Sequence, residues 1–299
     1  MKFYIITPSY QSLKWLRCCV RSVADQVGEG VEVHHHVQDG GSADGTPEWL
    51  AAWQQEHADV RGYTFTYESG RDAGMYDALN KAWEKLPQDA DVTAHLNSDE
   101  QYLPGVLSEV AAKMKAAPKA SMVIGSVILL EADGSYHCHR RCVKPHLWSS
   151  YTGCEILTCT CFHRASDFRR HGVRFDSRYR SIGDLVFFRD IMLRNPRVCV
   201  CADLFISAYT LTGNNLAWTD ATREDSRIYW PTVPRWRCLI HPIVYRVVNF
   251  KRRIIDRFCA APAAYSVYLG DADTRTERLI EKPSCIWRKC GYAANETQE

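Results

Sequence analysis

The sequence predicts an α/β fold in which a mostly parallel sheet carries helices on both faces. Through the first hundred residues, short apolar segments alternate with amphipathic segments of helical spacing, which is the pattern of strand, helix, strand units. The chain has 299 residues, 46% of them apolar and 24% charged, so it can bury roughly three quarters of the surface that an unfolded chain exposes. Disorder is therefore excluded as the overall state.

The first four strands are expected at residues 2–6, 31–37, 63–67 and 92–96, where apolar or alternating runs occur. After Pro8, apolar residues recur every three or four positions from Leu13 to Val23, which predicts the first helix. A second helix is expected to open at Thr46, before Pro47, and a third spans 75–86. Strands and helices thus alternate in this half.

The second half is less regular and predicts a mixed extension of the sheet. Residues 122–130 and 136–143 flank Asp133-Gly134 and predict a hairpin. Strands are expected at 157–162 and 198–209, and a helix at 184–193. Residues 239–258 form a basic amphipathic segment, and beyond Ala260 the sequence is weakly patterned.

Charge and cysteine content limit the class of protein. The 37 basic and 35 acidic residues leave a net charge of +2, which gives no general case for nucleic-acid binding. Residues 1–110 contain 8 basic and 17 acidic side chains, however, while the remainder contains 29 and 18. No run approaches the roughly 18 apolar residues of a spanning helix, and no signal peptide is visible, so we expect a cytoplasmic protein. The thirteen cysteines are expected to be reduced.

Polar segments follow each of the first four predicted strands. They are Thr7-Pro8-Ser9-Tyr10, Asp39-Gly40-Gly41-Ser42, residues 68–72 and Asn97-Ser98-Asp99-Glu100. Because parallel sheets bind ligands at the carboxyl ends of their strands, we expect these segments to converge on one site.

These segments resemble the family-2 inverting glycosyltransferases of the GT-A fold. The matching stretches are residues 6–10, 39–46, 72–81 and 96–100, and the match continues more weakly through 160–164 and 182–184 to about Asn215. The resemblance implies a Rossmann-like GT-A sheet with a nucleotide-sugar-binding half at 1–110. It implies an acceptor-binding and catalytic-base half of the same domain at 111–220, followed by a basic amphipathic C-terminal tail at 221–299.

The resemblance implies that the strand-end segments bind a nucleotide diphosphate sugar. Asp39 is suited to accept a hydrogen bond from a uracil-like base or a ribose, although Asp-Gly is also common turn chemistry. Arg71 is suited to pair with a diphosphate, although an exposed arginine is often only solvated. The full set implied for this role is Thr7, Pro8, Ser9, Tyr10, Asp39, Arg71, Asp72, Asn97 and Ser98.

A divalent cation, Mg²⁺ or Mn²⁺, is the implied cofactor. Asp99 takes the position of the last aspartate of the family's Asp-x-Asp metal motif, and a carboxylate together with a diphosphate suits a hard cation. The chain departs from the motif at Asn97, where the first aspartate is expected. The alternative for these carboxylates is a surface turn before Pro104.

Asp184 is implied as the catalytic base that takes the proton from the acceptor hydroxyl. It precedes an apolar helical stretch, so a helix N-cap is the alternative interpretation. Asp176, Asp167 and Glu100 are further candidates for the base. The surrounding basic residues indicate either a solvated face or a site for a phosphate-bearing acceptor; they are Arg164, Arg169, Arg170, His171, Arg174, Arg178 and Arg180.

The predicted function is transfer of a sugar, with inversion, to an acceptor hydroxyl in surface polysaccharide or lipid-linked glycan synthesis. Residues 239–258 are expected to lie on an anionic membrane surface, so the protein is expected at the inner face of the cell membrane; an ordinary docking helix is the alternative. A catalytically inactive nucleotide-sugar-binding scaffold remains open. A sugar-nucleotide nucleotidyltransferase is disfavoured because residues 7–13 contain no glycine.

Several histidine and cysteine groups are interpreted as structural. His34, His35 and His36 lie inside a predicted strand, so alternate side chains point to opposite faces. The pairs Cys159/Cys161 and Cys199/Cys201 are expected to share a sheet face each and to pack in the core, with zinc binding as the alternative. The same alternative applies to His137-Cys138-His139 with Cys142.

Overall fold

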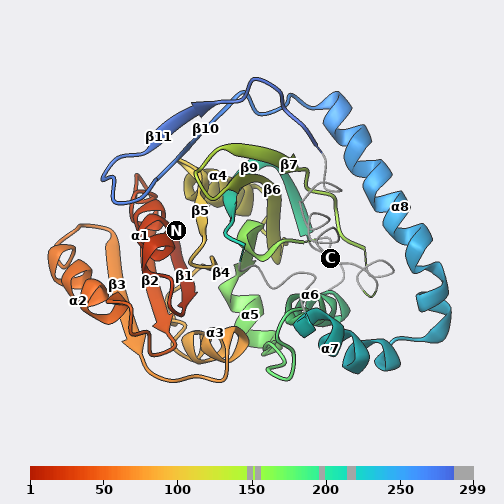
Figure 1. Cartoon of the computed structure of the whole chain (residues 1–299), viewed down its shortest axis with the longest axis horizontal. Coiled ribbons are helices and arrows are strands. Elements are labelled where there is room, and N and C mark those ends of the chain that lie inside the picture. The colour runs from red at the N-terminus through yellow and green to blue at the C-terminus, as the bar shows by residue number, and fades with distance from the viewer. Residues whose placement is uncertain (147–150, 152–155, 195–198, 214–219, 286–299) are drawn as a thin grey trace, which may run out of the picture.

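The computed structural model describes residues 1–146, 151, 156–194, 199–213 and 220–285. Its centre is a nine-stranded sheet in the order β3-β2-β1-β4-β8-β6-β9-β5, with β7 paired to β6 (Figure 1). The first four strands are mutually parallel where they pair: β1 (Lys2–Ser9), β2 (Glu32–Asp39), β3 (Tyr63–Ser69) and β4 (Val92–His95). The nucleotide-sugar-binding half predicted at 1–110 supplies this parallel part.

The sheet continues into a mixed region, as predicted. It comprises β5 (Glu100–Tyr102), β6 (Met122–Glu131), β7 (Tyr136–Arg140), β8 (Cys161–Arg164) and β9 (Cys199–Leu211). Strand β8 is antiparallel to β4 and β6, while β6 and β9 are parallel. Strands β6 and β7 form the predicted hairpin. The predicted start of β9, at Val198, lies outside the described residues.

Helices cover both faces of the sheet because successive β1 side chains point to opposite sides. Phe3 and Ile5 pack into one core with α1 (Leu13–Ala24), α2 (Thr46–Glu56) and α4 (Val106–Ala116). Tyr4 and Ile6 pack into the other core with α3 (Met75–Glu84), α5 (Ala165–His171), α6 (Gly183–Arg194) and α7 (Asp220–Tyr229). Both cores include residues from either side of position 110.

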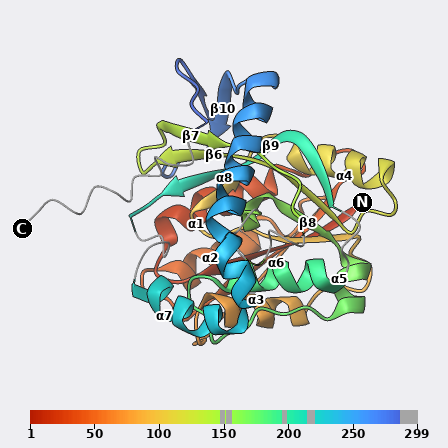
Figure 2. The ribbon, with the colours of Figure 1, turned by 90° about the vertical axis from the view of Figure 1, so that its right-hand side faces the viewer.

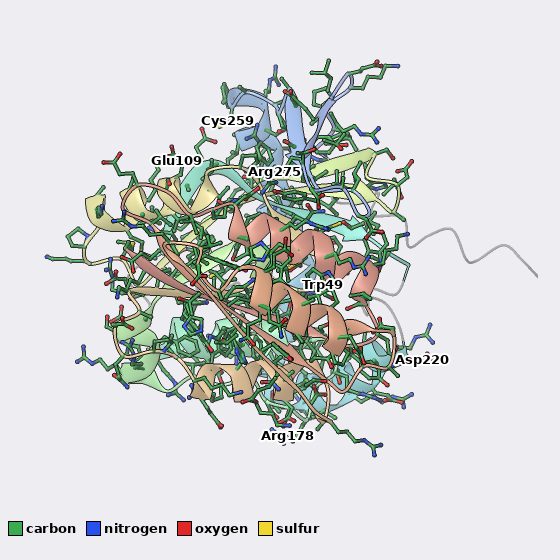
Figure 3. All side chains as sticks on the ribbon, turned by 90° about the vertical axis from the view of Figure 1, so that its left-hand side faces the viewer. Trp49, Glu109, Arg178, Asp220, Cys259 and Arg275 are labelled. Atoms are coloured by element: carbon green, nitrogen blue, oxygen red, sulfur yellow. The ribbon has the colours of Figure 1, made fainter. Side chains whose placement is uncertain are left out.

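The C-terminal segment runs around the outside of the sheet. Helix α8 (Arg235–Phe258) lies along one outer side, and a hairpin of β10 (Ala264–Val267) and β11 (Thr276–Leu279) returns to α1 (Figures 1 and 2). Arg275, labelled in Figure 3, pairs with Asp25 of the α1 C-cap at 2.5 Å. Among the helices that the structure describes, none combines the length and apolarity that a membrane crossing requires.

The strand predicted at 157–162 is wrong over most of its length. Residues Thr158–Thr160 form a 3₁₀ turn, and β8 begins only at Cys161. Cys159 and Cys161 consequently enter different cores rather than sharing a face. All cysteines in the described part of the chain are free thiols.

Candidate active site

The carboxyl ends of the four parallel strands lie side by side. Ser9 at the end of β1 is in register with Asp39 at the end of β2, which is in register with Ser69 at the end of β3. On the other side of β1, Ile6 is in register with His95 at the end of β4. The four polar segments therefore leave the sheet at one edge, as their positions in the sequence predict.

Asp39 organises the loop after β2. The side chain is fully buried, and its Oδ2 accepts hydrogen bonds from the Gly41 and Ser42 N–H groups and the Ser69 hydroxyl, at 3.1, 2.9 and 2.6 Å. Its Oδ1 accepts one hydrogen bond, from the Ser42 hydroxyl at 2.5 Å. The turn interpretation thus accounts for Oδ2, while Oδ1 still has a second lone pair for a ligand.

Hydrogen bonds join the loops after β1, β2 and β4. The Gln11 N–H donates to the Ser42 hydroxyl at 2.8 Å, and the Ser12 hydroxyl donates to that of Ser98 at 2.9 Å. Gln11 has a φ of 49°, and this strained conformation is held by its contact with Ser42. Beside it, the Tyr10 ring is 66% exposed. A ring presented from a fixed backbone is suited to stack on a base.

The loop after β3 packs against the two glycines of the β2 loop. A Cβ atom on Gly40 would lie 3.0 Å from Asp72 Oδ2 and 3.2 Å from the Tyr10 ring. Gly41, with a φ of 81°, lies against the Arg71 backbone, where its Cβ would come 3.5 Å from the Arg71 nitrogen. The glycines thus allow Tyr10, Arg71 and Asp72 to gather at one place. Within the described residues, the exposed Arg71 guanidinium has no hydrogen-bond or ion-pair partner.

The segment after β4 offers oxygen ligands. Asn97 Oδ1 is buried and has no hydrogen-bond partner in the described part of the chain. Asp99, two residues further along, is half-buried. Glu100 is buried, and this burial, together with the nearby Asp99 charge, raises the pKa of its carboxyl well above the ordinary value. An orphaned carbonyl oxygen two residues before the Asp99 carboxyl fits a hard divalent cation such as Mg²⁺ or Mn²⁺.

Asp184 lies at the start of α6, next to the start of α3. Its backbone N–H donates to the Tyr76 hydroxyl at 3.3 Å, and its Oδ1 accepts from the Leu185 N–H at 2.8 Å. Because α3 begins directly after the β3 loop, Tyr76 connects Asp184 to the segment that contains Arg71 and Asp72. Sequence reasoning missed Tyr76, although it lies inside the matching stretch 72–81.

The three alternative bases are less suited to this position. Both Asp176 oxygens accept hydrogen bonds from Arg178, which lowers the pKa of the Asp176 carboxyl and occupies its lone pairs. Asp167 lies in α5, which begins where Ala165 bonds to the Asp91 carbonyl at the start of β4, the opposite edge of the sheet. Glu100 is buried, and its Oε2 accepts a hydrogen bond from the Asn97 N–H at 2.7 Å, so its carboxyl is not open to an acceptor hydroxyl.

The basic residues around 164–180 are partly structural. The Arg164 guanidinium donates to the carbonyls of Ala120 and Met114, and that of Arg169 donates to the carbonyls of Pro87 and Ala90. Neither arginine is available for a phosphate-bearing acceptor. The interpretation of a single basic acceptor patch is therefore wrong for these two positions.

The histidine triplet lies within β2 as expected. His34 and His36 both contact the Thr66 hydroxyl at 2.9 Å, whereas His35 contacts Thr7 Oγ1 at 2.9 Å from the other face. This alternation is the one that the strand prediction requires.

Another group with metal-binding side chains lies outside the strand-end site. His139, Asp256 and Cys285 have ligand atoms within 4.8 Å of one another. His139 Nε2 lies 2.7 Å from Asp256 Oδ1, and the Arg141 Nε–H donates to the same oxygen at 3.0 Å. A guanidinium already neutralises this carboxylate, so the group fits an ion-pair network that anchors α8 better than it fits a cation site.

The sheet and its strand-end loops define an α/β protein of the nucleotide-binding kind, with carboxylates beside the ligand loops. The family model described as Glycosyl transferase family 2 matches residues 4–161. The chain belongs to this family.

Solved structures of S. aureus TarS share the fold. The chain is 16% identical to TarS 1–349 in complex with UDP-GlcNAc, with a TM-score of 0.58 over 86% of this chain and 67% of that one. TarS 1–349 in complex with UDP is 16% identical, with a TM-score of 0.55 over 72% of this chain and 62% of that one. TarS 1–349 without a ligand is 17% identical, with a TM-score of 0.54 over 70% of this chain and 60% of that one. The chain thus spans about 60 to 67% of these neighbours' length. The fold is GT-A, as the resemblance implied. A comparison with curated protein sequences found no significant match.

Proposed function

We propose that the protein transfers a sugar, with inversion, from a nucleotide diphosphate sugar to an acceptor hydroxyl. The observation that carries this proposal is the convergence of four polar loops at the carboxyl ends of β1 to β4, joined by the Gln11–Ser42 and Ser12–Ser98 hydrogen bonds. The complexes of TarS with UDP and UDP-GlcNAc support a uridine nucleotide as the first donor to test.

In this proposal each strand-end loop contacts a different part of the donor. Asp39 Oδ1 accepts from the N–H of a uracil-like base, and the exposed Tyr10 ring stacks on that base. Arg71 pairs with the diphosphate, and its unpartnered guanidinium matches that task. Pro8, Ser9, Asp72 and Ser98 complete the walls of the site, whereas the Thr7 side chain is buried against His35.

Asp99, with Asn97 Oδ1 beside it, would hold Mg²⁺ or Mn²⁺. When bound, the cation supplies positive charge next to the departing diphosphate. Because Asn97 is neutral, the site has one negative charge fewer than an Asp-x-Asp motif, so Asp99 provides most of the attraction for the cation. We expect Asp99→Asn to remove most activity, and full activity in excess chelator would contradict the cation requirement.

Asp184 acts as the general base. Its carboxylate takes the proton of the acceptor hydroxyl as the hydroxyl oxygen bonds to the anomeric carbon. The bond from that carbon to the diphosphate oxygen breaks on the opposite side, and the electron pair leaves with the nucleoside diphosphate. This direct displacement inverts the anomeric carbon.

The base assignment is tested by two matched variants. We expect Asp184→Asn to lower transfer by roughly 10² to 10⁴-fold with little change in donor affinity, and Asp176→Asn to retain turnover. If the Asp184 side chain only supports the first turn of α6, where it accepts the Leu185 N–H, its asparagine variant keeps activity because an amide oxygen accepts that bond as well. A protein that binds donors yet transfers and hydrolyses none would be a nucleotide-sugar-binding scaffold.

Helix α8 runs along the outside of the molecule (Figure 2), and apolar side chains are exposed along its length. Seven of its side chains, spaced three or four residues apart, are exposed, with Leu239 and Phe258 at 79% and 83%; they are Trp236, Leu239, Ile243, Val247, Phe250, Ile254 and Phe258. The opposite face is buried against the body through Val244 and Val248. An apolar stripe of this length is typical of helices that lie in a membrane interface.

The charges that flank this stripe favour an anionic partner. Arg235, Arg246, Arg253 and Arg257 are exposed, while the helix's acidic residue, Asp256, pairs with His139 and Arg141. Arg252, by contrast, is buried on the inner side of the helix and bonds to Asn249. Two copies of this face would repel each other, so we propose that α8 lies on an anionic membrane, where lipid-linked glycan acceptors are found.

Liposome flotation tests this membrane proposal. We expect the protein to float with phosphatidylglycerol vesicles at low salt and not with neutral phosphatidylcholine vesicles. Phe250→Glu should abolish flotation, whereas Leu279→Glu, at a still more exposed apolar position on β11, should leave it unchanged. Equal flotation of both variants would contradict the proposal, as would dimers in solution that Phe250→Glu dissociates.

A further inference from the structure

Asp225 on α7 holds the segment that precedes α6. Its carboxylate is 2% exposed and accepts hydrogen bonds from three consecutive backbone N–H groups. The N–H groups of Arg180, Ser181 and Ile182 lie 2.9, 2.6 and 3.0 Å from Oδ2. One turn earlier on α7, the Thr222 hydroxyl lies 2.8 Å from that of Ser181. Helix α7 therefore supplies the hydrogen-bond acceptors for the whole segment 180–182.

This segment sets where α6 begins. The Ile182 carbonyl accepts the first hydrogen bonds of the helix. On the other side, Gly183 lies against the Tyr76 ring of α3, where a Cβ atom would come within 2.5 Å of the ring. The start of α6 is thus fixed between α3 and α7, and Asp184 is the second residue of that helix.

Helix α7 is itself fixed to the protein body. Tyr229, one turn after Asp225, is fully buried, and its hydroxyl donates to the Tyr151 carbonyl at 2.7 Å. The Arg189 guanidinium of α6 lies 5.6 Å from the centre of the Tyr229 ring. Asp225 is therefore presented from a rigid support.

We propose that Asp225 is a positioning residue for sugar transfer, which holds the segment 180–182 so that the Asp184 carboxylate meets the acceptor hydroxyl. The proposal rests on the function proposed above for Asp184. A displacement of about 1 Å in a reacting group costs roughly 10²-fold in rate. Three N–H groups converge on one oxygen, an arrangement that a carboxylate satisfies best and an amide oxygen satisfies in part.

Three variants test the proposal: Asp225→Ala, Asp225→Asn and, as the control on the exposed side of α7, Glu224→Ala. Hydrogen exchange reports on the amides of 180–182, calorimetry gives the dissociation constant of UDP-GlcNAc, and hydrolysis of that donor gives turnover. For Asp225→Ala we expect at least tenfold faster exchange confined to this segment. Turnover should fall about 10²-fold, with the donor dissociation constant changed less than about threefold.

The conservative and double variants separate positioning from mere stability. Asp225→Asn should recover turnover to within about tenfold of wild type, and Glu224→Ala should match wild type. In the Asp184→Asn variant, adding Asp225→Ala should lower turnover by less than about a further threefold, because both changes remove the contribution of the Asp184 carboxylate.

Each contrary outcome has its own meaning. Wild-type turnover in Asp225→Ala, with faster exchange at 180–182, would show a structural role only. A full additional loss in the Asp184→Asn background would show that Asp225 does not act through Asp184. A wild-type protein that hydrolyses no nucleotide sugar would refute the proposed function, and this role with it, even if the amides respond as expected.

Discussion

Asn97 is the residue at which this chain departs from the family's metal motif, and its Oδ1 is buried without a hydrogen-bond partner in the described residues. The restoring substitution Asn97→Asp adds a second carboxylate near Asp99. We expect it to lower the Mn²⁺ concentration for half-maximal activity by about tenfold, since charge dominates affinity for hard cations. The measurement is a Mn²⁺ titration of donor hydrolysis, and an unchanged or higher requirement would argue against a cation at this position.

Gly40 shows how one missing side chain shapes the donor site. In Gly40→Ala the new methyl group lies 3.0 Å from Asp72 Oδ2 and 3.2 Å from the Tyr10 ring, so both must move. We expect the dissociation constant for UDP to rise about tenfold with little loss of thermal stability. Gly70→Ala is the control because nothing lies within 4 Å of its new methyl group. Equal affinities of the two variants would show that Tyr10 and Asp72 do not contact the ligand.

At the scale of elements, three strands bury histidines that are held neutral. Burial lowers the pKa of His35 on β2 and His95 on β4 to about 3, and that of His163 on β8 to about 4. The unfolded chain binds protons below about pH 6.5, whereas the folded protein does not until these lower values. This contribution to stability is therefore complete above pH 6.5 and is lost as the pH falls toward 4.

His163→Phe tests this pH dependence, because His163 already packs against the rings of Phe168, Phe187 and Phe188. Between pH 7 and pH 5 we expect the variant to lose about 2 kcal/mol less unfolding free energy than wild type. Urea denaturation at the two pH values measures the difference, with His171→Phe, at a half-buried position of α5, as the control. Identical losses in wild type and His163→Phe would contradict the account.

The parallel strands and their helices were predictable because each has a strong period of its own. The apolar patterns of residues 2–6 and 13–23 predict β1 and α1. The position of the loop between them, at the carboxyl end of β1, follows from the parallel topology of the sheet. Of the elements that were not predicted, α4 has Val106, Val110 and Met114 buried at helical spacing, whereas β5 and α7 have weak patterns of their own. Strand β5 has three residues and exists through its pairing with β9, while α7 is a polar helix whose buried contacts are Asp225 and Tyr229.

At the scale of the whole molecule, the C-terminal hairpin is joined to the N-terminal half of the chain. Gln101 on β5 is buried; its side chain donates to the Tyr268 carbonyl at 3.0 Å and accepts from the Tyr268 N–H at 2.8 Å. Gln101→Ala leaves both backbone groups unpaired, so we expect unfolding free energy to fall by about 2 to 4 kcal/mol. Glu277→Ala, at an exposed position of β11, should cost little. Equal stabilities would show that the hairpin is not part of the cooperative unit.

The candidate site was predictable only in part. Asp39, Asn97 and Asp99 could be predicted as site residues because they lie at or after the ends of predicted strands. The parallel order of the strands brings these ends together. The contacts that align Asp184 come from Tyr76 and Asp225. Asp225 lies 43 to 45 residues from its partners in sequence, and a buried aspartate on a polar helix has no local signature.

Binding of nucleotide sugars to the purified protein tests the central claim most directly. We expect UDP-GlcNAc or another nucleotide diphosphate sugar, with Mn²⁺, to raise the thermal unfolding midpoint, since a ligand at about 100 times its dissociation constant adds roughly 2.7 kcal/mol. Asp39→Asn should lose most of this stabilisation. Because Asp39 also accepts hydrogen bonds from Gly41, Ser42 and Ser69, the gain is measured against the variant's own unfolding midpoint without ligand. If no nucleotide sugar in a panel of uridine, guanosine, cytidine and thymidine donors stabilises the wild-type protein at millimolar concentration, the strand-end loops do not form a donor site.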